Sequence, residues 1–423
     1  MLPSHLAISF PIWALHDTQG NGAYHDLDRM MAETVQRGFN CIRFDDGAGL
    51  IDFSSNPPNG VVSICEPYPG FSSIIRQQWC CGKGGPCDLL ERLVQLMEAA
   101  KRHNVYVILS SWYYLHTFWY CGDENVNRRL HALPPHERFQ FFAEQLDHIL
   151  SYLRERDLLG QVAFAEILNE ADGLNFVGGY SSQTNPEHEL FRQDHEAAIA
   201  YLRQRHPDVL FAYDTYTAWT KEAMFPSNAQ VWNFHSYYLW PIYSILEGKL
   251  LASTTDLTDP RELACAQPYL SEFPIPLQQI IDSRKGRLPG DWYRRIWLYN
   301  NLEPRQIPAL EQLFFAKFAQ ERHRYEDELI KALEQAVALR NRLCPDARLV
   351  MAESCSYIGS YSLLWEEHCD SYWDMLEFVA KQFRKYDLWG AAIRTCSGCE
   401  DPSWLIRADD YRRINGILTA ENL

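Results

Sequence analysis

The sequence contains no apolar run close to the roughly 20 residues that a membrane-spanning helix needs. Its N-terminus lacks the basic start and the long apolar segment of a secretory signal. These two absences predict a cytoplasmic protein. The twelve cysteines agree with a reducing compartment, because several lie within predicted strands, where a thiol behaves as a small apolar residue.

An excess of positive charge is also missing. The formal net charge of −16 argues against nucleic acid or an anionic membrane surface as a partner. Neither an internal repeat nor a low-complexity tract occurs in the sequence. Of the 423 residues, 47% are hydrophobic, so the chain can bury one large core or two modest ones, and its composition disfavours disorder. The oligomeric state stays open.

Signatures of bound metals and phosphates are absent as well. A structural zinc site usually needs four ligands in paired Cys-x-x-Cys or Cys/His spacing. Cys396 and Cys399 have this spacing, but the cysteines of segment 80–87 lack a regular partner. The glycine-rich residues 82–85 follow no predicted strand and lack the spacing of a phosphate-binding loop. We therefore expect neither a metal ion nor a cofactor.

What the sequence does contain is an alternation of strand and helix patterns from end to end. Eight such units favour an α/β fold of the (β/α)8 TIM-barrel type. An open doubly wound sheet is the alternative, but no glycine-rich fingerprint follows the first strand to support it. We expect strands at 6–13, 40–44, 105–109, 162–168, 209–213, 231–234, 347–352 and 388–393, and helices at 24–37, 88–103, 137–157, 187–205, 309–343, 371–386 and 410–418.

The alternation is interrupted between the sixth and seventh predicted strands. Residues 241–308 are rich in Pro, Trp and Tyr and predict an insertion subdomain. Because loops at the active-site face carry specificity in barrels, we place this insertion on that face of a single catalytic domain, residues 1–423. A packed structural subdomain away from the pocket is the alternative.

Two carboxylates stand at the ends of two apolar strands. Residues 164–170 predict a short buried strand that ends in Asn169-Glu170, and Glu353 closes a second apolar run. A charge at the mouth of an apolar strand is costly unless something uses it, and two such carboxylates are what glycosidic-bond cleavage needs. Strand alternation predicts Glu166 and Glu170 on one face and Asn169 on the other. We expect the deeper Glu166 to be structural, paired with an arginine or a hydroxyl.

This pattern resembles the cellulase-like (β/α)8 glycoside hydrolases, the large retaining clan that includes family 5. The resemblance spans most of the chain. It implies that Glu170 is the acid/base, that Asn169 binds the sugar 2-hydroxyl and that Glu353 is the nucleophile of a double displacement.

Other strand ends fit the same resemblance. Residues 38–43 resemble the clan's second strand, whose arginine, here Arg43, steadies the nucleophile. We expect Arg43 to donate charge-assisted hydrogen bonds to Glu353 and to keep it ionised. His235 and Tyr237, after the sixth strand, resemble the clan's His-x-Tyr, in which the tyrosine hydroxyl contacts the nucleophile.

The sequence departs from many family 5 members at two strands. Residues 110–114 stand where those proteins carry a histidine, and residues 394–398 stand where the clan often places a tryptophan platform. Endo-cellulase activity is therefore not implied. We expect Trp112 and Trp404 to offer aromatic faces to a sugar ring and Asp45 to bind a sugar hydroxyl. Core packing of each tryptophan, and a turn or cap role of Asp45, are the alternatives.

The sequence thus predicts a retaining glycoside hydrolase that cleaves β-glycosidic bonds of short oligosaccharides or glycosides with two Glu residues. The preference for small substrates depends on the missing secretion signal, the lack of a binding module and an insertion that would narrow the cleft. Two alternatives stay open. One is a non-catalytic carbohydrate-binding barrel, and the other is a metal-dependent isomerase or lyase that would recruit Asp214, His235 and Glu353. The sugar, its linkage and exo versus endo action are not predicted.

Overall fold

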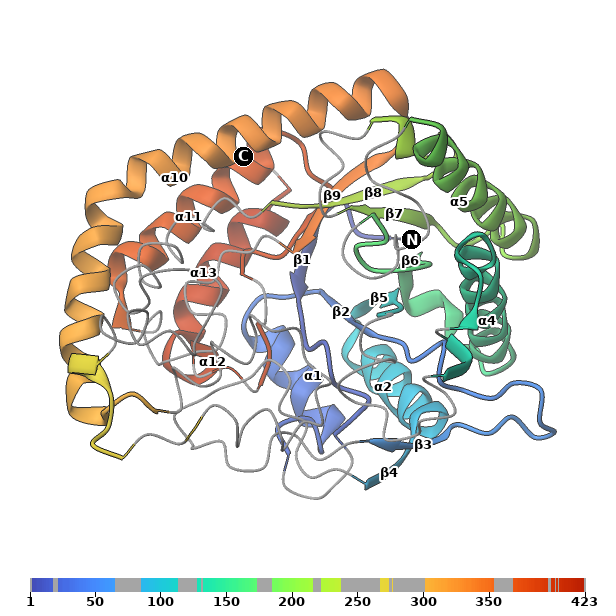
Figure 1. The fold of residues 1–423 in the computed structure, drawn as a ribbon, viewed down its shortest axis with the longest axis horizontal. Coiled ribbons are helices and arrows are strands. Elements are labelled where there is room, and N and C mark those ends of the chain that lie inside the picture. Colours follow the sequence, from blue (N-terminus) through green and yellow to red (C-terminus); the bar gives the residue numbers. More distant parts are fainter. Residues whose placement is uncertain are drawn as a thin grey trace.

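Eight short parallel strands close into a barrel in the computed structural model of the chain (Figure 1). Their order around the barrel is β1-β10-β9-β8-β7-β6-β5-β2, and pairing of β1 with β2 completes the ring. This closure confirms the predicted (β/α)8 barrel. The structure describes residues 2–17, 22–64, 85–112, 128–130, 132–172, 185–215, 222–236, 267–273, 276, 301–353, 368–394, 397–399, 401 and 403–421.

Every predicted strand is present, although the ends differ. The last strand has two residues where six were predicted, and it passes close to the first strand. A Cβ added at Gly390 would lie 3.1 Å from Leu6 Cβ and 3.1 Å from Ile8 Cδ1, so glycine permits the close approach that completes the barrel. The bounds are β1 Leu6–Ser9, β2 Cys41–Asp45, β5 Tyr106–Ser110, β6 Val162–Glu166, β7 Phe211–Thr215, β8 Val231–His235, β9 Arg348–Glu353 and β10 Gly390–Ala391.

Amphipathic helices surround the strands (Figure 1). The ends of α2 follow the usual rules: Asp88 caps the helix by accepting hydrogen bonds from the N–H groups of Leu90 and Glu91, and Asn104 ends it in the left-handed conformation. The helices are α1 Leu27–Gln36, α2 Leu89–His103, α4 Pro135–Glu155, α5 Asn185–Arg205, α10 Ile307–Leu343, α11 Asp370–Lys385, α12 Ser403–Ile406 and α13 Ala408–Thr419. Short 3₁₀ turns lie at Leu159–Gln161, Glu222–Met224, Gln267–Tyr269 and Pro304–Gln306.

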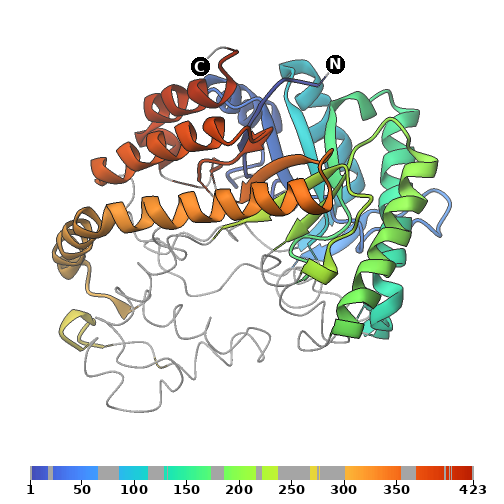
Figure 2. The same cartoon turned by 90° about the horizontal axis from the view of Figure 1, so that it is seen from above.

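The interval between β8 and β9 contains the long α10, as predicted. This helix runs along the outside of the molecule beside α11 (Figure 2). Of residues 241–308, the structure describes 267–273, 276 and 301–308, so the predicted insertion subdomain falls mostly outside the described residues. Among the described helices, none is both long and apolar enough to span a membrane.

A described strand pair outside the barrel was not predicted, nor was the short helix α12. Strands β3 (Val61–Ile64) and β4 (Gly85–Asp88) pair in antiparallel fashion outside the barrel. Each has four residues, and β4 contains glycine, proline and aspartate, which are depleted in strands. Composition therefore gives no strand signal at β4, whereas β3 contains two valines and an isoleucine, which favour a strand.

The interior of the barrel has an apolar floor and a polar layer above it. Alternate strand residues form an apolar cluster without helix residues, whereas their neighbours pack against the helices. On five strands the residue two positions further along is polar, and alternation keeps it on the same interior face. These polar residues are Arg43 on β2, Ser110 on β5, Glu166 on β6, Asp214 on β7 and Asn233 on β8, all of them fully buried or nearly so.

Candidate active site

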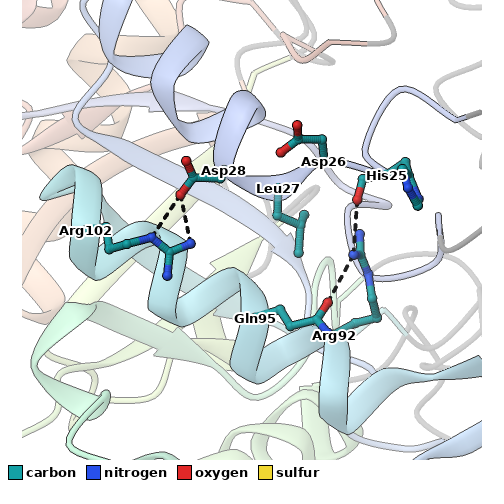
Figure 3. Close-up of a pocket in the computed structure, with 7 residues that line it drawn as sticks. All are labelled: His25, Asp26, Leu27, Asp28, Arg92, Gln95 and Arg102. Carbon is teal, nitrogen blue, oxygen red and sulfur yellow. Dashed lines mark hydrogen bonds and ion pairs between the residues drawn. The ribbon is translucent and has the colours of Figure 1, made fainter. Parts of the chain in front are cut away.

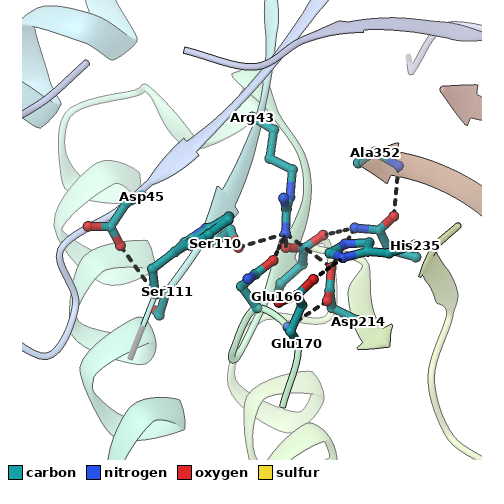
Figure 4. Close-up of polar contacts among 12 residues, drawn as sticks. Arg43, Asp45, Ser110, Ser111, Glu166, Glu170, Asp214, His235 and Ala352 are labelled. Carbon is teal, nitrogen blue, oxygen red and sulfur yellow. Dashed lines mark hydrogen bonds and ion pairs between the residues drawn. The ribbon is translucent and has the colours of Figure 1, made fainter. Parts of the chain in front are cut away.

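Arg43 lies at the centre of the polar layer (Figure 4). Its Nη2 is 2.7 Å from Glu166 Oε2, 3.0 Å from Asp214 Oδ2 and 3.2 Å from Ser110 Oγ. Its Nε also donates to Glu166 Oε2, at 3.1 Å. The guanidinium and both carboxylates have no exposed surface, so these contacts replace water around the three charges. This confirms the predicted pairing of Glu166 with an arginine.

Asn233 connects the same two carboxylates from β8. Its Nδ2 donates to Glu166 Oε1 and to Asp214 Oδ2, both at 2.7 Å. Its Oδ1 accepts from the N–H of Ala352 in β9, at 2.8 Å. The amide therefore ties four strands together and gives each buried carboxylate a donor in addition to Arg43.

The two buried carboxylates are held in different ways. Burial raises the pKa of Glu166; the Arg43 charge opposes this rise and the Asp214 charge adds to it. Burial also acts to raise the pKa of Asp214, but the hydrogen bond of His235 and the positive charge that this imidazole carries when protonated, together with Arg43, outweigh it and hold the pKa below its ordinary value. Asp214 is therefore held in its ionised form within the network.

Glu170 enters the site through a left-handed turn. Strand β6 ends at Glu166, two residues before the predicted end, and Glu170 has a φ of +48°. Its backbone N–H donates to Asp214 Oδ1 at 2.7 Å, which holds this uncommon conformation. The predicted strand alternation up to Glu170 is therefore wrong, because the chain has already left the strand.

The predicted opposite placement of Asn169 is wrong for the same reason. Asn169 Oδ1 lies 2.6 Å from Arg43 Nη2, the nitrogen that also contacts Glu166. Its backbone N–H donates to the carbonyl of Ser111 at 2.9 Å. Asn169 thus joins the buried network instead of facing the helices.

His235 at the end of β8 connects Glu170 to this network. His235 Nδ1 is 2.8 Å from Glu170 Oε1, and His235 Nε2 is 3.0 Å from Asp214 Oδ2. The imidazole has no exposed surface. Both ring nitrogens are thereby engaged by carboxylates that come from two neighbouring strands.

The backbone of Glu353 lies opposite His235. The pairing of β8 with β9 shifts by one residue after Asn233, so that His235 pairs with Glu353 and not with Ala352. Such a shift locally re-aims a strand and is common beside active sites. The side chain of Glu353 and all of Tyr237 lie outside the described residues, so their predicted contacts, including the one between Arg43 and Glu353, remain predictions.

A second buried polar group lies at the ends of β1, β2 and β5. Asp45 Oδ1 accepts from the N–H of Trp112 at 3.1 Å, and Asp45 Oδ2 is 3.5 Å from His16 Nε2. Asp46 Oδ1 accepts from Ser111 Oγ at 2.9 Å. Burial lowers the pKa of His16 to about 3, raises that of Asp45 well above its ordinary value and raises that of Asp46 to about 7. Asp45 therefore fixes the end of β5, and its contact with a sugar remains a prediction.

Trp112 is packed among other side chains and is 2% exposed. Its ring centroid lies 5.8 Å from that of Phe10 and 5.9 Å from that of Trp13, and the Arg43 guanidinium is 5.4 Å from its ring. This environment agrees with core packing, the alternative to sugar contact for Trp112. Its predicted substrate contact remains a prediction.

Trp404 lies in the helix layer, where it is 1% exposed. Its ring stacks on Phe39 with centroids 5.8 Å apart, the Arg37 guanidinium lies 4.4 Å from it, and its N–H donates to Glu33 Oε2 at 2.8 Å. A ring covered in this way is not available to stack on a sugar. The geometry therefore argues against the predicted substrate contact of Trp404.

The sequence analysis missed Asn233 and the structural importance of Asp214. Asp214 was considered only as a metal ligand beside His235 and Glu353, but here it accepts hydrogen bonds from Arg43, Asn233 and His235. In the part of the chain that the structure describes, no three His, Cys, Asp or Glu side chains are arranged to hold a metal ion. Both Asp214 and Asn233 could have been found from the sequence, because each stands two positions after an apolar residue of a buried strand and therefore on the same face of that strand.

A pocket of about 360 Å³ lies elsewhere, between α1 and α2 (Figure 3). An ion pair of 2.8 Å joins Asp28 to Arg102, and the buried Arg92 donates to the carbonyl of Tyr24 at 2.7 Å. These contacts tie the two helices together. The lining residues are His25, Asp26, Leu27, Asp28, Arg92, Gln95 and Arg102, and none of them belongs to the buried network.

Comparisons with known proteins give a family and a fold. Residues 10–244 match the family described as sugar-binding cellulase-like. The structure of a candidate glycoside hydrolase from Parabacteroides distasonis aligns with a TM-score of 0.66 at 16% identity, over 100% of this chain and 95% of that chain. At that identity the likeness shows the fold alone.

Two structures from Prevotella bryantii align less well. An endo-beta-mannanase/endo-beta-glucanase has a TM-score of 0.49 at 12% identity, over 99% of this chain and 49% of that chain. A family 5 glycoside hydrolase has a TM-score of 0.47 at 12% identity, over 97% of this chain and 96% of that chain. No curated protein matches the chain.

Proposed function

The chain belongs to the sugar-binding cellulase-like family, and from that premise we propose that it is a retaining glycoside hydrolase with Glu170 as acid/base and Glu353 as nucleophile. The family match covers residues 10–244, more than half of the chain, and includes Glu170 and His235. Membership confirms the resemblance to the cellulase-like (β/α)8 glycoside hydrolases. Glu353 lies beyond the matched residues, so its role depends on the structure and on the resemblance of its strand.

One observation carries the proposal. His235 accepts or donates a hydrogen bond at Glu170 Oε1, 2.8 Å away, and the same residue is the register partner of Glu353. Neighbouring strands lie about 4.8 Å apart. The two proposed catalytic positions therefore converge on one histidine, at the end of the barrel where active sites of this fold are found.

The first chemical step uses the two carboxyl groups in opposite protonation states. The Glu353 carboxylate attacks the anomeric carbon, the bond from that carbon to the leaving oxygen breaks, and Glu170 gives its proton to that oxygen. A covalent glycosyl-enzyme results. Retaining enzymes hold their carboxyl groups about 5–5.5 Å apart. At this separation no water molecule fits between the nucleophile and the anomeric carbon, so the carboxylate itself attacks.

The second step reverses the role of Glu170. Glu170, now ionised, takes a proton from a water molecule while the water oxygen attacks the anomeric carbon and the bond to Glu353 breaks. Asn169 would bind the sugar 2-hydroxyl through its Nδ2, because its Oδ1 is turned toward Arg43. Short oligosaccharides or glycosides are the proposed substrates, and a cytoplasmic location remains a prediction.

The test is chromophore release from a panel of aryl β-glycosides by wild type, Glu170→Ala and Glu353→Ala, with and without azide. We expect one sugar to be hydrolysed, with kcat of both variants at least about a hundred-fold lower. Azide should rescue Glu353→Ala as an α-glycosyl azide and Glu170→Ala as a β-glycosyl azide, because azide replaces the nucleophile in one case and water in the other.

The exposed Glu189 on α5 supplies a matched control, since Glu189→Ala removes a carboxylate outside the site. Turnover that survives Glu353→Ala unchanged would refute the assignment of the nucleophile. Sugar binding without hydrolysis of any glycoside by the wild type would instead support a non-catalytic carbohydrate-binding barrel.

A further inference from the structure

Asp214 is connected to Glu170 in two ways, once directly and once through His235. Its Oδ1 accepts the backbone N–H of Glu170 at 2.7 Å, and its Oδ2 lies 3.0 Å from Nε2 of the His235 that contacts the Glu170 carboxyl group. We propose that Asp214 is a positioning residue. Through His235 it determines the protonation state of the Glu170 carboxyl group, the general acid of the reaction. This inference depends on the proposed function, because it concerns the acid of that reaction.

The first part of the argument is the tautomer of His235. Asp214 is fully buried and surrounded by donors, namely Arg43 Nη2 at 3.0 Å and Asn233 Nδ2 at 2.7 Å on the same oxygen that faces His235. An ionised carboxylate accepts hydrogen bonds and donates none, so the proton of the neutral imidazole is held on Nε2. His235 Nδ1 then presents its lone pair.

The second part is the contact with Glu170. Because His235 Nδ1 carries no proton in this tautomer, the hydrogen in its 2.8 Å contact with Glu170 Oε1 belongs to the carboxyl group. Glu170 is thereby kept in the acid form that the first step requires. After Glu170 has given up this proton, the same lone pair faces its carboxylate and favours uptake of a proton from water in the second step.

The backbone contact gives Asp214 a second function at the same residue. A φ of +48° is uncommon for a residue with a side chain, and the bond from Glu170 N–H to Asp214 Oδ1 holds it. The carboxyl group of Glu170 therefore points to His235 only while this turn is held. One side chain fixes both the place and the proton of the acid.

Other charged and titratable groups of the described residues pack around the relay. Arg43 on β2 and Glu166 on β6 lie on the floor side of Asp214 and neutralise each other through their 2.7 Å contact. His195 on α5 is buried and kept neutral, since burial lowers its pKa to about 3. Glu353 on β9 is the register partner of His235 and enters as the nucleophile of the proposed reaction.

The experiment compares wild type, Asp214→Asn and Asp208→Asn on two glycosides of one sugar. One leaving group is dinitrophenol, which departs without protonation, and the other is an alkyl alcohol, which needs it. Asparagine cannot both accept the Glu170 N–H and accept from His235. We expect Asp214→Asn to lower kcat/KM at least about a hundred-fold for the alkyl glycoside and less than about ten-fold for the dinitrophenyl glycoside.

The alkaline limb of the pH–rate profile of Asp214→Asn should also move to lower pH, because the altered tautomer donates to Glu170 and favours its ionised form. Asp208→Asn is the matched control, since Asp208 is exposed in the turn before β7 and pairs with Arg154 on the surface. If Asp214→Asn does not fold, His235→Gln should give the same division between the two leaving groups.

The outcomes separate this inference from the function on which it depends. Equal loss on both glycosides with an unmoved pH profile, in a wild type that hydrolyses both, would overturn the role of Asp214 alone. A wild type that hydrolyses neither glycoside would overturn the proposed function itself. A loss confined to the alkyl glycoside, together with a moved alkaline limb, supports the role of Asp214.

Discussion

The buried histidine of α5 gives a prediction about acid stability. His195 stacks on Phe139 with ring centroids 4.3 Å apart and contacts Tyr213 at 5.2 Å. Neither of its ring nitrogens has a hydrogen-bond partner among the residues that the structure describes. Burial lowers its pKa from 6.5 to about 3, against a small opposing effect of Asp214. His195 is therefore neutral in the folded protein at mildly acidic pH. In the unfolded chain at the same pH it binds a proton.

The size of the effect follows from linkage. The folded pKa lies below the unfolded one, so the contribution of His195 is fully present above pH 6.5 and is lost as the pH falls toward about 3. Each pH unit in that window costs about 1.4 kcal/mol of unfolding free energy. His195→Phe removes the titrating group and keeps an aromatic ring against Phe139. Between neutral pH and about pH 5 the wild type should lose about 2 kcal/mol more than the variant.

The assay is urea denaturation followed by tryptophan fluorescence at neutral pH and at about pH 5. His136→Gln is the control, because His136 lies in α4 with its side chain 62% exposed. The control should follow the wild type at both pH values. Parallel losses in the wild type and in His195→Phe would refute the reasoning, since they would mean that the folded protein accepts a proton at His195 as readily as the unfolded chain does.

Two further predictions concern the polar groups of the barrel. Burial raises the pKa of Asp46 from 3.8 to about 7, so its contribution to the unfolding free energy is present below pH 3.8 and is lost as the pH rises toward 7. Within that window Asp46→Asn should gain stability relative to the wild type by about 1.4 kcal/mol per pH unit. Urea midpoints of the two proteins that change in parallel with pH would contradict this. Arg43→Met leaves Glu166 and Asp214 buried without their cation and should lower the unfolding free energy by about 3–5 kcal/mol in the same assay, with part of the loss recovered by adding Glu166→Gln. A double variant no more stable than Arg43→Met would show that Glu166 is not the group left uncompensated.

Apolar runs between turn residues were enough to find all eight strands of the barrel. The strand ends were harder to predict, because tertiary contacts decide them. In β6, residues up to Leu168 continue the apolar pattern, yet the chain turns after Glu166 because the N–H of Glu170 bonds to Asp214. Asp214 is 44 residues away in the sequence, and local patterns carry no information about that contact.

The candidate site was predicted in part. A carboxylate at a strand end stands out, which is why Glu170 was noticed, whereas Asn233 lies inside the predicted strand 231–234 and carries no charge that would single it out. Trp404 shows the opposite error, because a tryptophan near the last strand fits a sugar platform and a helix-layer core equally well until its neighbours are known. Burial of Trp404 against Phe39 and Arg37 decides between the two.

The polar layer restricts how this barrel can change during evolution. Arg43, Glu166, Asp214 and Asn233 satisfy one another across four strands, so replacing any one of them takes a hydrogen-bond partner from at least two other buried polar groups. Single substitutions toward an apolar interior therefore pass through unstable sequences, although the fully apolar barrel at the end of that route would pack well. The layer is therefore expected to resist stepwise replacement, even at positions that do not touch the substrate.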